Sequence, residues 1–469
     1  MSDHVEPEKG YSSDNESQQP IYERPKGLKG LYMHPVTQLV MLALVCFMCP
    51  GLFNALGGLG GGGQLDETTS DNSLTALYAA FAVCGFFAGS INNKLGARLT
   101  LLLGSFGYAL YIGSYLALNI HPITAKGFVI GAGAILGVCA GLLWAAQGSL
   151  MMAYPTEGQK GRFISIFWGI FNLGAVVGSS VALGQNIHSQ GNQVNNGTYI
   201  GFIVLTCTGM FIPLLMADPE KMIRTDGTKV TVPRQLSWST EIYGLWVALR
   251  TDPMIILLFP MFLVSNWFYT WQFNDYNGAI FDIGARSLNN ELYWISQIVG
   301  SAAMGFLLDA KSIRRRHRAF IGIAVLTAMI FLVHIWAYFY QKQYTRESPQ
   351  LFHIQDPSYP GRIMLYIFCG LLDAMWQTAT YWLMGAMSND PAKLAYFAGF
   401  YKSLQSAGAA GVWHADAIKL PYMNIFLSTW ILLVASIIFA LPMVYLRVKE
   451  HTAIEDEALT RMDSHGHVA

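Results

Sequence analysis

Residues 127–151 read GFVIGAGAILGVCAGLLWAAQGSLM, an apolar run that contains no Asp, Glu, Lys or Arg. Because a bilayer core about 30 Å thick needs about 20 apolar residues per helix, this run predicts a membrane-spanning helix. Eleven more such runs lie between polar breaks, near 35–59, 74–93, 100–118, 163–184, 199–216, 254–271, 292–309, 319–340, 363–387, 395–414 and 422–446. The sequence therefore predicts an all-helical, multi-pass membrane protein with twelve transmembrane helices.

The composition of the 469-residue chain supports this class of protein. Apolar residues make up 53% of it and charged residues 12%, which is about half the charged fraction of an ordinary soluble domain. The 29 basic and 29 acidic residues balance, so no overall charge attracts nucleic acid. All six cysteines lie in apolar stretches rather than in loops where a disulfide framework or a zinc site would form. We expect the lipid bilayer as a partner, and no nucleic acid, cofactor, metal or catalytic residue.

The distribution of cations orients the chain. With the N-terminal tail placed in the cytoplasm, that side of the membrane carries 22 Lys and Arg and the other side carries 6, as the positive-inside rule requires. We therefore expect both termini to be cytoplasmic, in either the plasma membrane or an endomembrane. The sequon Asn196-Gly-Thr198 falls on the outer side, which predicts glycosylation at Asn196.

The polar connection after the sixth span divides the chain into six plus six. We expect a disordered cytoplasmic tail (1–34), an N-terminal six-helix half (35–216), a cytoplasmic linker (217–253), a C-terminal six-helix half (254–446) and a cytoplasmic tail (447–469). Within the linker, the stretch from Trp238 to Leu249 fits an amphipathic surface helix or a plain linker turn. The glycine run 57–63 lacks the Lys and Ser/Thr of a phosphate-binding loop, and we expect it to unwind the outer end of the first helix.

Polar residues inside the spans recur with a period of three helices. In lipid such side chains collect where they meet a cavity or one another. The third, sixth and ninth spans contain no Asn, Gln, Asp, Glu, Lys or Arg, and the twelfth has only Asn424 near its outer end. Two repeats of three-helix units would place every third helix at the periphery, which by analogy is the major facilitator architecture.

Two cytoplasmic turns favour the same architecture. The turn after the second span contains Gly89, Asn93, Lys94, Gly96 and Arg98. It resembles the superfamily turn Gly-x-Leu-x-Asp-Arg-x-Gly-Arg, with Asn in place of Asp. The turn after the eighth span retains its acid and contains Gly305 and Asp309. In such turns glycine lets two helices approach while the carboxylate locks the cytoplasmic gate; an ordinary charged turn is the alternative.

Longer motifs resemble a known family. The motifs are 51–64 (GLFNALGGLGGGGQ), 144–148 (WAAQG), 154–157 (YPTE), 167–174 (FWGIFNLG), 274–277 (NDYN), 373–377 (DAMWQ) and 401–408 (YKSLQSAG). Together they resemble the uncoordinated-ninety-three (Unc-ninety-three-like) family of major facilitator relatives, in its fungal-type branch, over about residues 35–446. The resemblance implies a regulatory subunit of a potassium channel, an escort for innate immune receptors, or a transporter, since members of all three kinds are known.

Asp373 is the strongest functional pointer in the sequence. It lies about midway through the tenth span, where an intramembrane carboxylate needs a partner or a proton. Gln377 and Tyr381 follow at intervals of four and share its helix face. We expect Lys402 in the next helix to pair with Asp373, with Gln405 one turn further on. Asp373 is then either a coupling or substrate-contact group, or half of a buried ion pair that fixes two helices.

Further candidates come from the other spans. Trp144 with Gln147 and Trp168 with Asn172 present indole and amide groups one turn apart, which suits a ligand cavity or helix–helix hydrogen bonding. We expect Asn54, Gln147, Asn172, Gln297, Asp373 and Gln405 to converge between the two halves. The first hypothesis is a transporter of a small-molecule solute by alternating access, with proton coupling through Asp373. The alternative is a non-transporting membrane protein that escorts or regulates a channel or receptor.

Overall fold

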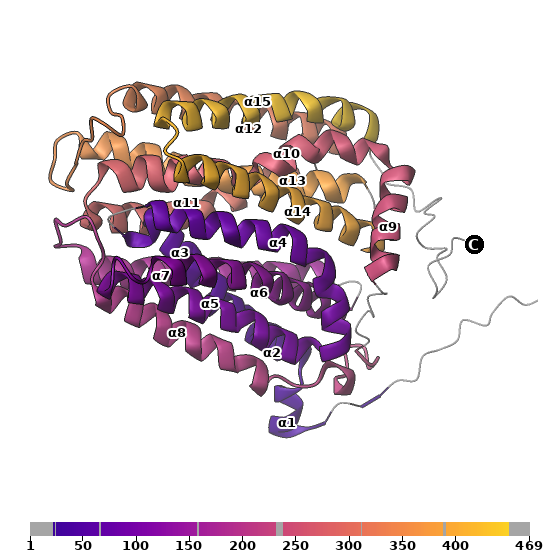
Figure 1. Ribbon diagram of the computed structural model, residues 1–469. Helices are drawn as coiled ribbons and strands as arrows, with labels where there is room; N and C mark the ends of the chain where they lie inside the picture. The colour runs from indigo at the N-terminus through magenta and orange to yellow at the C-terminus, as the bar shows by residue number, and fades with distance from the viewer. Residues whose placement is uncertain are drawn as a thin grey trace, which may run out of the picture.

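The chain folds into a bundle of long helices (Figure 1). The computed structural model describes residues 22–449 except 24, 65–66, 157–158, 231–237, 311 and 388–390. The first half contains α1 Gly27–Tyr32, α2 Pro35–Cys46, α3 Leu52–Gly58, α4 Thr68–Leu95, α5 Ala97–Ile120, α6 Lys126–Ala153, α7 Lys160–Asn186 and α8 Asn196–Leu215. The second contains α9 Trp238–Thr251, α10 Phe259–Leu263, α11 Ile283–Leu308, α12 Arg315–Gln341, α13 Tyr359–Met387, α14 Pro391–Ala417 and α15 Tyr422–Arg447.

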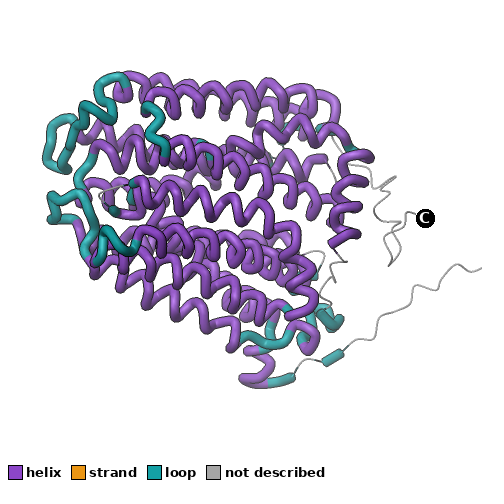
Figure 2. The backbone as a smooth tube through the Cα atoms, viewed as in Figure 1, coloured by secondary structure: helices purple, strands orange, loops and turns teal. Residues whose placement is uncertain are grey.

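Helix and connecting loop make up the described backbone, apart from two isolated bridges between Ile223 and Lys229 and between Phe281 and Phe352 (Figure 2). Two rods contain irregular turns. A π-helical turn, Phe47–Gly51, joins α2 to α3 around Pro50, and α10 is flanked by 3-10 turns and the π-helix Thr270–Gly278. The prediction of an all-helical membrane protein is confirmed.

In the part of the chain that the structure describes, fewer than twelve helices meet the requirements for a membrane span. Within the described residues, nine helical rods are long and apolar enough to cross a bilayer, and α4, bent by 66° between Gly85 and Phe87, would be a tenth. The rods α11 and α14 cover the expected eighth and eleventh spans but are too polar to qualify. Several of their polar side chains, including Asn290 and Gln405, are hydrogen-bonded inside the protein, so these two helices need not face lipid along their length.

The two halves of the chain have separate apolar cores that meet along two pairs of helices. One core is built almost wholly from residues before 231 and the other from residues after 246. Helix α4 packs on α14, and α7 packs on α11, so each half contributes two helices to the interface (Figure 1). Helices α8, α12 and α15 lie at the outside and expose apolar side chains, including Phe211, Phe331 and Phe439. Helix α5 also exposes Leu103 and Phe106, so all four of the spans expected to be poor in polar groups form part of the outer wall.

Both ends of the described chain lie at one end of the bundle. Helix α1 and the end of α15 are on the same side as α9, and Arg447 pairs with Asp252 just after α9 at 2.7 Å (Figure 1). Helix α1 lies within residues 1–34, where a disordered tail was expected. The Tyr32 hydroxyl donates to the Leu215 carbonyl oxygen at 2.6 Å and holds α1 against the end of α8. Residues 1–21, 24 and 450–469 of the two tails lie outside the described residues. Helix α9 forms where a surface helix or a turn was expected.

The opposite end of the bundle, which we call the Asn196 end, contains the unwound end of the first rod. Helix α3 stops at Gly58, and Gly60 to Gly63 all have positive φ, from 52° to 78°. Residues with a side chain rarely adopt this backbone conformation, so glycine is required here. The expected unwinding of the glycine run is therefore observed.

An ion pair at the Asn196 end makes stability depend on pH. Asp282 accepts from the Ala285 backbone N–H at 2.7 Å at the start of α11 and also bonds His353, and this bond raises the pKa of His353 above its usual range. The stabilisation is therefore present below about pH 6.5 and is lost as the pH rises through the raised pKa. We expect His353→Gln to lower the melting temperature in detergent at pH 5.5 but hardly at pH 9. An equal loss at both values would contradict this.

Candidate functional site

Asp373 is buried at the centre of a polar network in the C-terminal half. It is 1% exposed on α13, and its carboxylate accepts from the Tyr293 hydroxyl at 2.9 Å and from the Gln297 amide, both on α11. The Gln377 amide, one turn along α13, lies at 3.5 Å from its other oxygen. Such bonds favour a charged carboxylate, which without them would be costly inside the protein. The four-residue spacing does place Gln377 beside Asp373.

The network continues from Gln377 to α14. The Tyr401 hydroxyl donates to the Gln377 side-chain oxygen, and the Gln405 amide lies 3.5 Å from the same atom. Gln405 also donates to Asn266 at 2.8 Å and accepts from the Lys402 ammonium at 3.1 Å. Lys402 therefore meets Gln405 rather than Asp373, and two amides link the two charges. The direct ion pair stays a prediction for another conformation.

Aromatic rings connect this network to the N-terminal half. Trp144 on α6 stacks on Trp168 on α7 with centroids 6.3 Å apart, and Trp168 lies 6.3 Å from Tyr381 on α13. The Tyr381 ring meets Tyr401 edge-on at 5.1 Å, and the Lys402 ammonium lies over both tyrosine rings, at 5.9 and 5.2 Å. A cation over aromatic faces next to side-chain amides offers recognition for a polar solute.

Three expected cavity residues lie apart from this network. Gln147 is buried on α6 and donates to the Met151 sulfur at 3.4 Å. Asn54 on α3 and Asn172 on α7 are half-buried. The structure therefore brings together Gln297, Asp373, Gln377, Tyr381, Lys402 and Gln405, with Trp144 and Trp168 adjoining them. The convergence of all six polar residues on one central region stays a prediction.

The expected gate turns lie at the end opposite Asn196. Gly96 joins α4 to α5 with φ of 77°, and Arg98 donates to the carbonyl oxygens of Pro213 and Leu214 at the end of α8, at 3.3 and 2.6 Å. Asp309 caps the end of α11, where Arg318 donates to the Leu308 carbonyl at 2.7 Å. Guanidinium groups at helix C-termini thus stabilise both turns. Of the other predicted gate residues, Gly89, Asn93 and Lys94 lie in the last turns of α4 and Gly305 lies in the last turn of α11.

Asn196 is exposed at the start of α8, where its side chain accepts from the Asn119 amide at 2.8 Å. Its use as a glycan site stays a prediction and tests the orientation. We expect Asn196→Gln to remove a glycosidase-sensitive mobility shift of the full chain expressed in a eukaryotic cell, and Asn15→Gln, in the other sequon, to leave it unchanged. A shift that depends on Asn15 instead would place the tails outside.

The structure also reveals a polar region that the sequence did not predict. Asp71 on α4, Asp275 in the π-helix Thr270–Gly278 and Asp416 on α14 are fully buried at the Asn196 end, beside Arg346. Asp373 is therefore not the only buried acid in the bundle. The predicted spans began at 74 and ended at 271 and 414, whereas the helical segments continue further and carry these acids into the interior.

A second unpredicted feature joins the halves at this end, and we call it the clasp. The Arg286 guanidinium on α11 donates to the carbonyl oxygens of Leu59 and Gly60 at 2.7 and 2.5 Å, and to that of Asn192 at 2.9 Å. Asn277 donates to the Gly58 carbonyl oxygen at 2.9 Å, and Asn290 donates to that of Ala55 at 2.7 Å. Side chains from the C-terminal half thus satisfy carbonyl groups that the unwound helix end leaves free.

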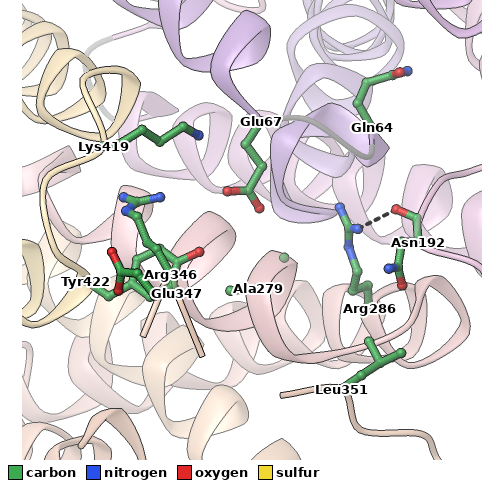
Figure 3. Close-up of a pocket in the computed structure, with 11 residues that line it drawn as sticks. Gln64, Glu67, Asn192, Ala279, Arg286, Arg346, Glu347, Leu351, Lys419 and Tyr422 are labelled. Carbon is green, nitrogen blue, oxygen red and sulfur yellow. Dashed lines mark hydrogen bonds between the residues drawn. The ribbon is translucent and has the colours of Figure 1, made fainter. Parts of the chain in front are cut away.

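A cavity lies between these two features. Its volume is about 470 Å³, and charged side chains on its wall include Glu67, Arg286, Arg346 and Lys419. The Glu67 carboxylate points into the space between Arg346 and Lys419 on one side and Arg286 on the other (Figure 3). The cavity wall therefore carries charges of both signs close to the buried acids.

Comparison with known proteins identifies related chains. The family model described as "Ion channel regulatory protein UNC-93" matches residues 62–441. UNC93-like protein C922.05c of Schizosaccharomyces pombe is 47% identical, with 93% of this chain and 88% of that protein covered. UNC93-like protein 1 of Arabidopsis thaliana is 40% identical, with 90% and 92% covered.

Among solved structures, a POT family transporter in complex with 5-aminolevulinic acid has a TM-score of 0.62 at 15% identity, with 91% of this chain and 99% of that chain covered. At this identity the likeness shows the fold, which is that of major facilitator transporters. The match to the family model covers most of the chain and the relatives cover nearly all of it, so the expected resemblance is confirmed. This chain belongs to the UNC-93 family.

Proposed function

We propose that the protein is a major-facilitator-type transporter of a small polar solute that works by alternating access. The observation that carries this proposal is the network from Asp373 to Lys402, with the aromatic rings that join it to the N-terminal half. A buried carboxylate, two amides and a cation, next to aromatic side chains from both halves, provide groups that two rocking halves could present to either side in turn.

The helix pairs between the halves support the same proposal. For the Asn196 end to open, α4 must separate from α14, α7 must separate from α11, and the clasp must release, while each half keeps its own apolar core. Rigid-body movement of two packed units is the usual form of alternating access in this architecture. Asp373 is then a coupling group, since its charge can change by one proton.

The experiment that tests this proposal compares small-molecule contents of membrane vesicles with and without the full-length protein. Untargeted metabolite analysis should find at least one polar solute whose gradient depends on the protein. If the contents are the same under every imposed pH gradient, the transporter proposal is wrong.

The family description favours a second candidate function, regulation of an ion channel. A protein of this kind would act through its outer surface, such as the exposed apolar face of α12 with Phe331 and Phe339. Substitutions on that face would then change the channel partner's current, while Asp373→Asn would not. The transporter proposal expects the reverse.

A further inference from the structure

The buried acids at the Asn196 end are tied to the clasp through one side chain. The Asn274 amide nitrogen donates to Asp71 at 2.6 Å and to Asp416 at 2.9 Å, while its oxygen accepts from the Gly61 backbone N–H at 2.8 Å. Asp71 and Gly61 belong to the N-terminal half, and Asn274 and Asp416 belong to the C-terminal half. The protonation state of these carboxylates therefore affects whether the two halves stay together at this end.

The cluster contains more carboxylates than its cation can neutralise. The Arg346 guanidinium bonds Asp416 and lies 3.6 Å from an oxygen of Asp275. Among the described residues, no group hydrogen-bonds either oxygen of Asp275 or the second oxygen of Asp71, although both residues have 0% exposure. A bare buried carboxylate is strongly unfavourable, and such a group takes up a proton instead.

The neighbouring cavity adjoins these acids through Arg346, which lines the cavity and bonds Asp416, and through Glu67. The titratable and charged groups that face the cluster from the surrounding elements are Glu67 before α4, Tyr115 on α5, Arg286 on α11, Tyr344 and Arg346 between α12 and α13, Lys419 after α14 and Tyr422 on α15. Burial, and then the Asp416 carboxylate, raise the pKa of Glu67 to about 7. A group on the cavity wall thus exchanges protons near neutral pH.

We propose that Asp71, Asp275 and Asp416 form a proton-binding site that holds the Asn196 end closed. With a proton bound, the carboxylates of the two halves share the Asn274 amide and the clasp stays intact. When the proton leaves to water in the cavity, like charges in Asp71 on one half and Asp275 and Asp416 on the other repel, and the end opens. The inference rests on the proposed function, because an open Asn196 end is one of the two states that alternating access requires.

The direction of the pH dependence follows from this. The closed state binds the proton more tightly than the open state, in which the acids are hydrated, so closure is favoured at low pH and lost as the pH rises. Replacing an acid by its amide leaves a neutral group of the same size. We expect Asp275→Asn and Asp71→Asn each to keep the end closed at all pH values.

The test measures the distance between spin labels on the two halves in the full-length protein. Labels are placed at Ile123, between α5 and α6, and at Ser348, between α12 and α13, which are both exposed, after replacement of Cys84 and Cys207. In sodium-free buffer we expect one short distance at pH 5 and a growing longer component up to pH 9. Asp275→Asn and Asp71→Asn should abolish the longer component, whereas Glu347→Gln, on the cavity wall outside the cluster, should retain it.

Arg286→Ala separates the failure of this proposal from the failure of the proposed function. Without its guanidinium the clasp should open at every pH. If that variant shows the long distance while wild type ignores pH, the proton site is wrong and alternating access stands. If neither pH nor the substitution lengthens the distance, both proposals fall. A pH response that persists in both amide variants, or an opening that follows sodium and not pH, would also overturn the proton site.

Discussion

Asp373→Asn should reduce solute transport by about ten- to a hundredfold. The amide matches the carboxylate in size and can keep a bond to Tyr293, but it carries no charge and cannot take up or release a proton. Hydrogen bonds to a charged group contribute about 1.5–3 kcal/mol, and each 1.4 kcal/mol lost from the rate-limiting barrier is about tenfold in rate. The measurement is the initial rate at which the solute gradient forms in vesicles under a pH gradient.

The matched control for this variant is Asp226→Asn. Asp226 is exposed in the linker between the halves, where it bonds Thr228 and touches nothing in the network. Its amide should transport like wild type. Equal rates for Asp373→Asn, Asp226→Asn and wild type would remove Asp373 from the mechanism and leave it a structural role.

Arg286→Ala should cause a large loss of stability at the Asn196 end. Arg286 is 2% exposed, and its removal takes a donor from three carbonyl groups, at Leu59, Gly60 and Asn192. A buried polar group left without a partner costs about 1–3 kcal/mol. We therefore expect the free energy of unfolding to fall by roughly 3 kcal/mol, measured by thermal or denaturant unfolding in detergent.

Arg98→Ala is the comparison for this result. Arg98 also donates to two backbone carbonyl groups, but at a half-exposed position where water can replace it. Its loss should lower the free energy of unfolding by about 1 kcal/mol or less. If the two arginine variants are equally stable, the clasp does not hold the end together.

The sequence predicted those features that depend on spacing along one helix. Asp373, Gln377 and Tyr381 share a face of α13 because residues four apart always do. The apolar runs located the helical rods because burial in lipid requires long stretches without charge. The unwinding after Gly58 was also predictable, since a run of glycines favours neither helix nor any other single conformation.

Features that depend on packing between helices were not predictable. Asp71, Asp275 and Asp416 lie beyond the apolar runs, so they read as loop residues, and only the packed bundle shows that they are buried. From the sequence, Arg286 was one of the few cations expected in the outer loops. In the structure it binds backbone carbonyl groups of the N-terminal half. Likewise, Lys402 was expected to pair with Asp373 because it lies in the next helix. In the structure the amides of Gln377 and Gln405 lie between the two charged groups.

We expect the two halves to separate at the Asn196 end during transport. Ser180 on α7 donates to Glu291 on α11 at 2.9 Å, across the interface and at an exposed position. In a chain with Ser180→Cys and Glu291→Cys, and with Cys84 and Cys207 replaced, a short bifunctional methanethiosulfonate reagent should link the halves. We predict that the solute gradient then falls to the level of protein-free vesicles and returns when a reductant cleaves the link. Undiminished transport by fully linked protein would contradict alternating access at this end.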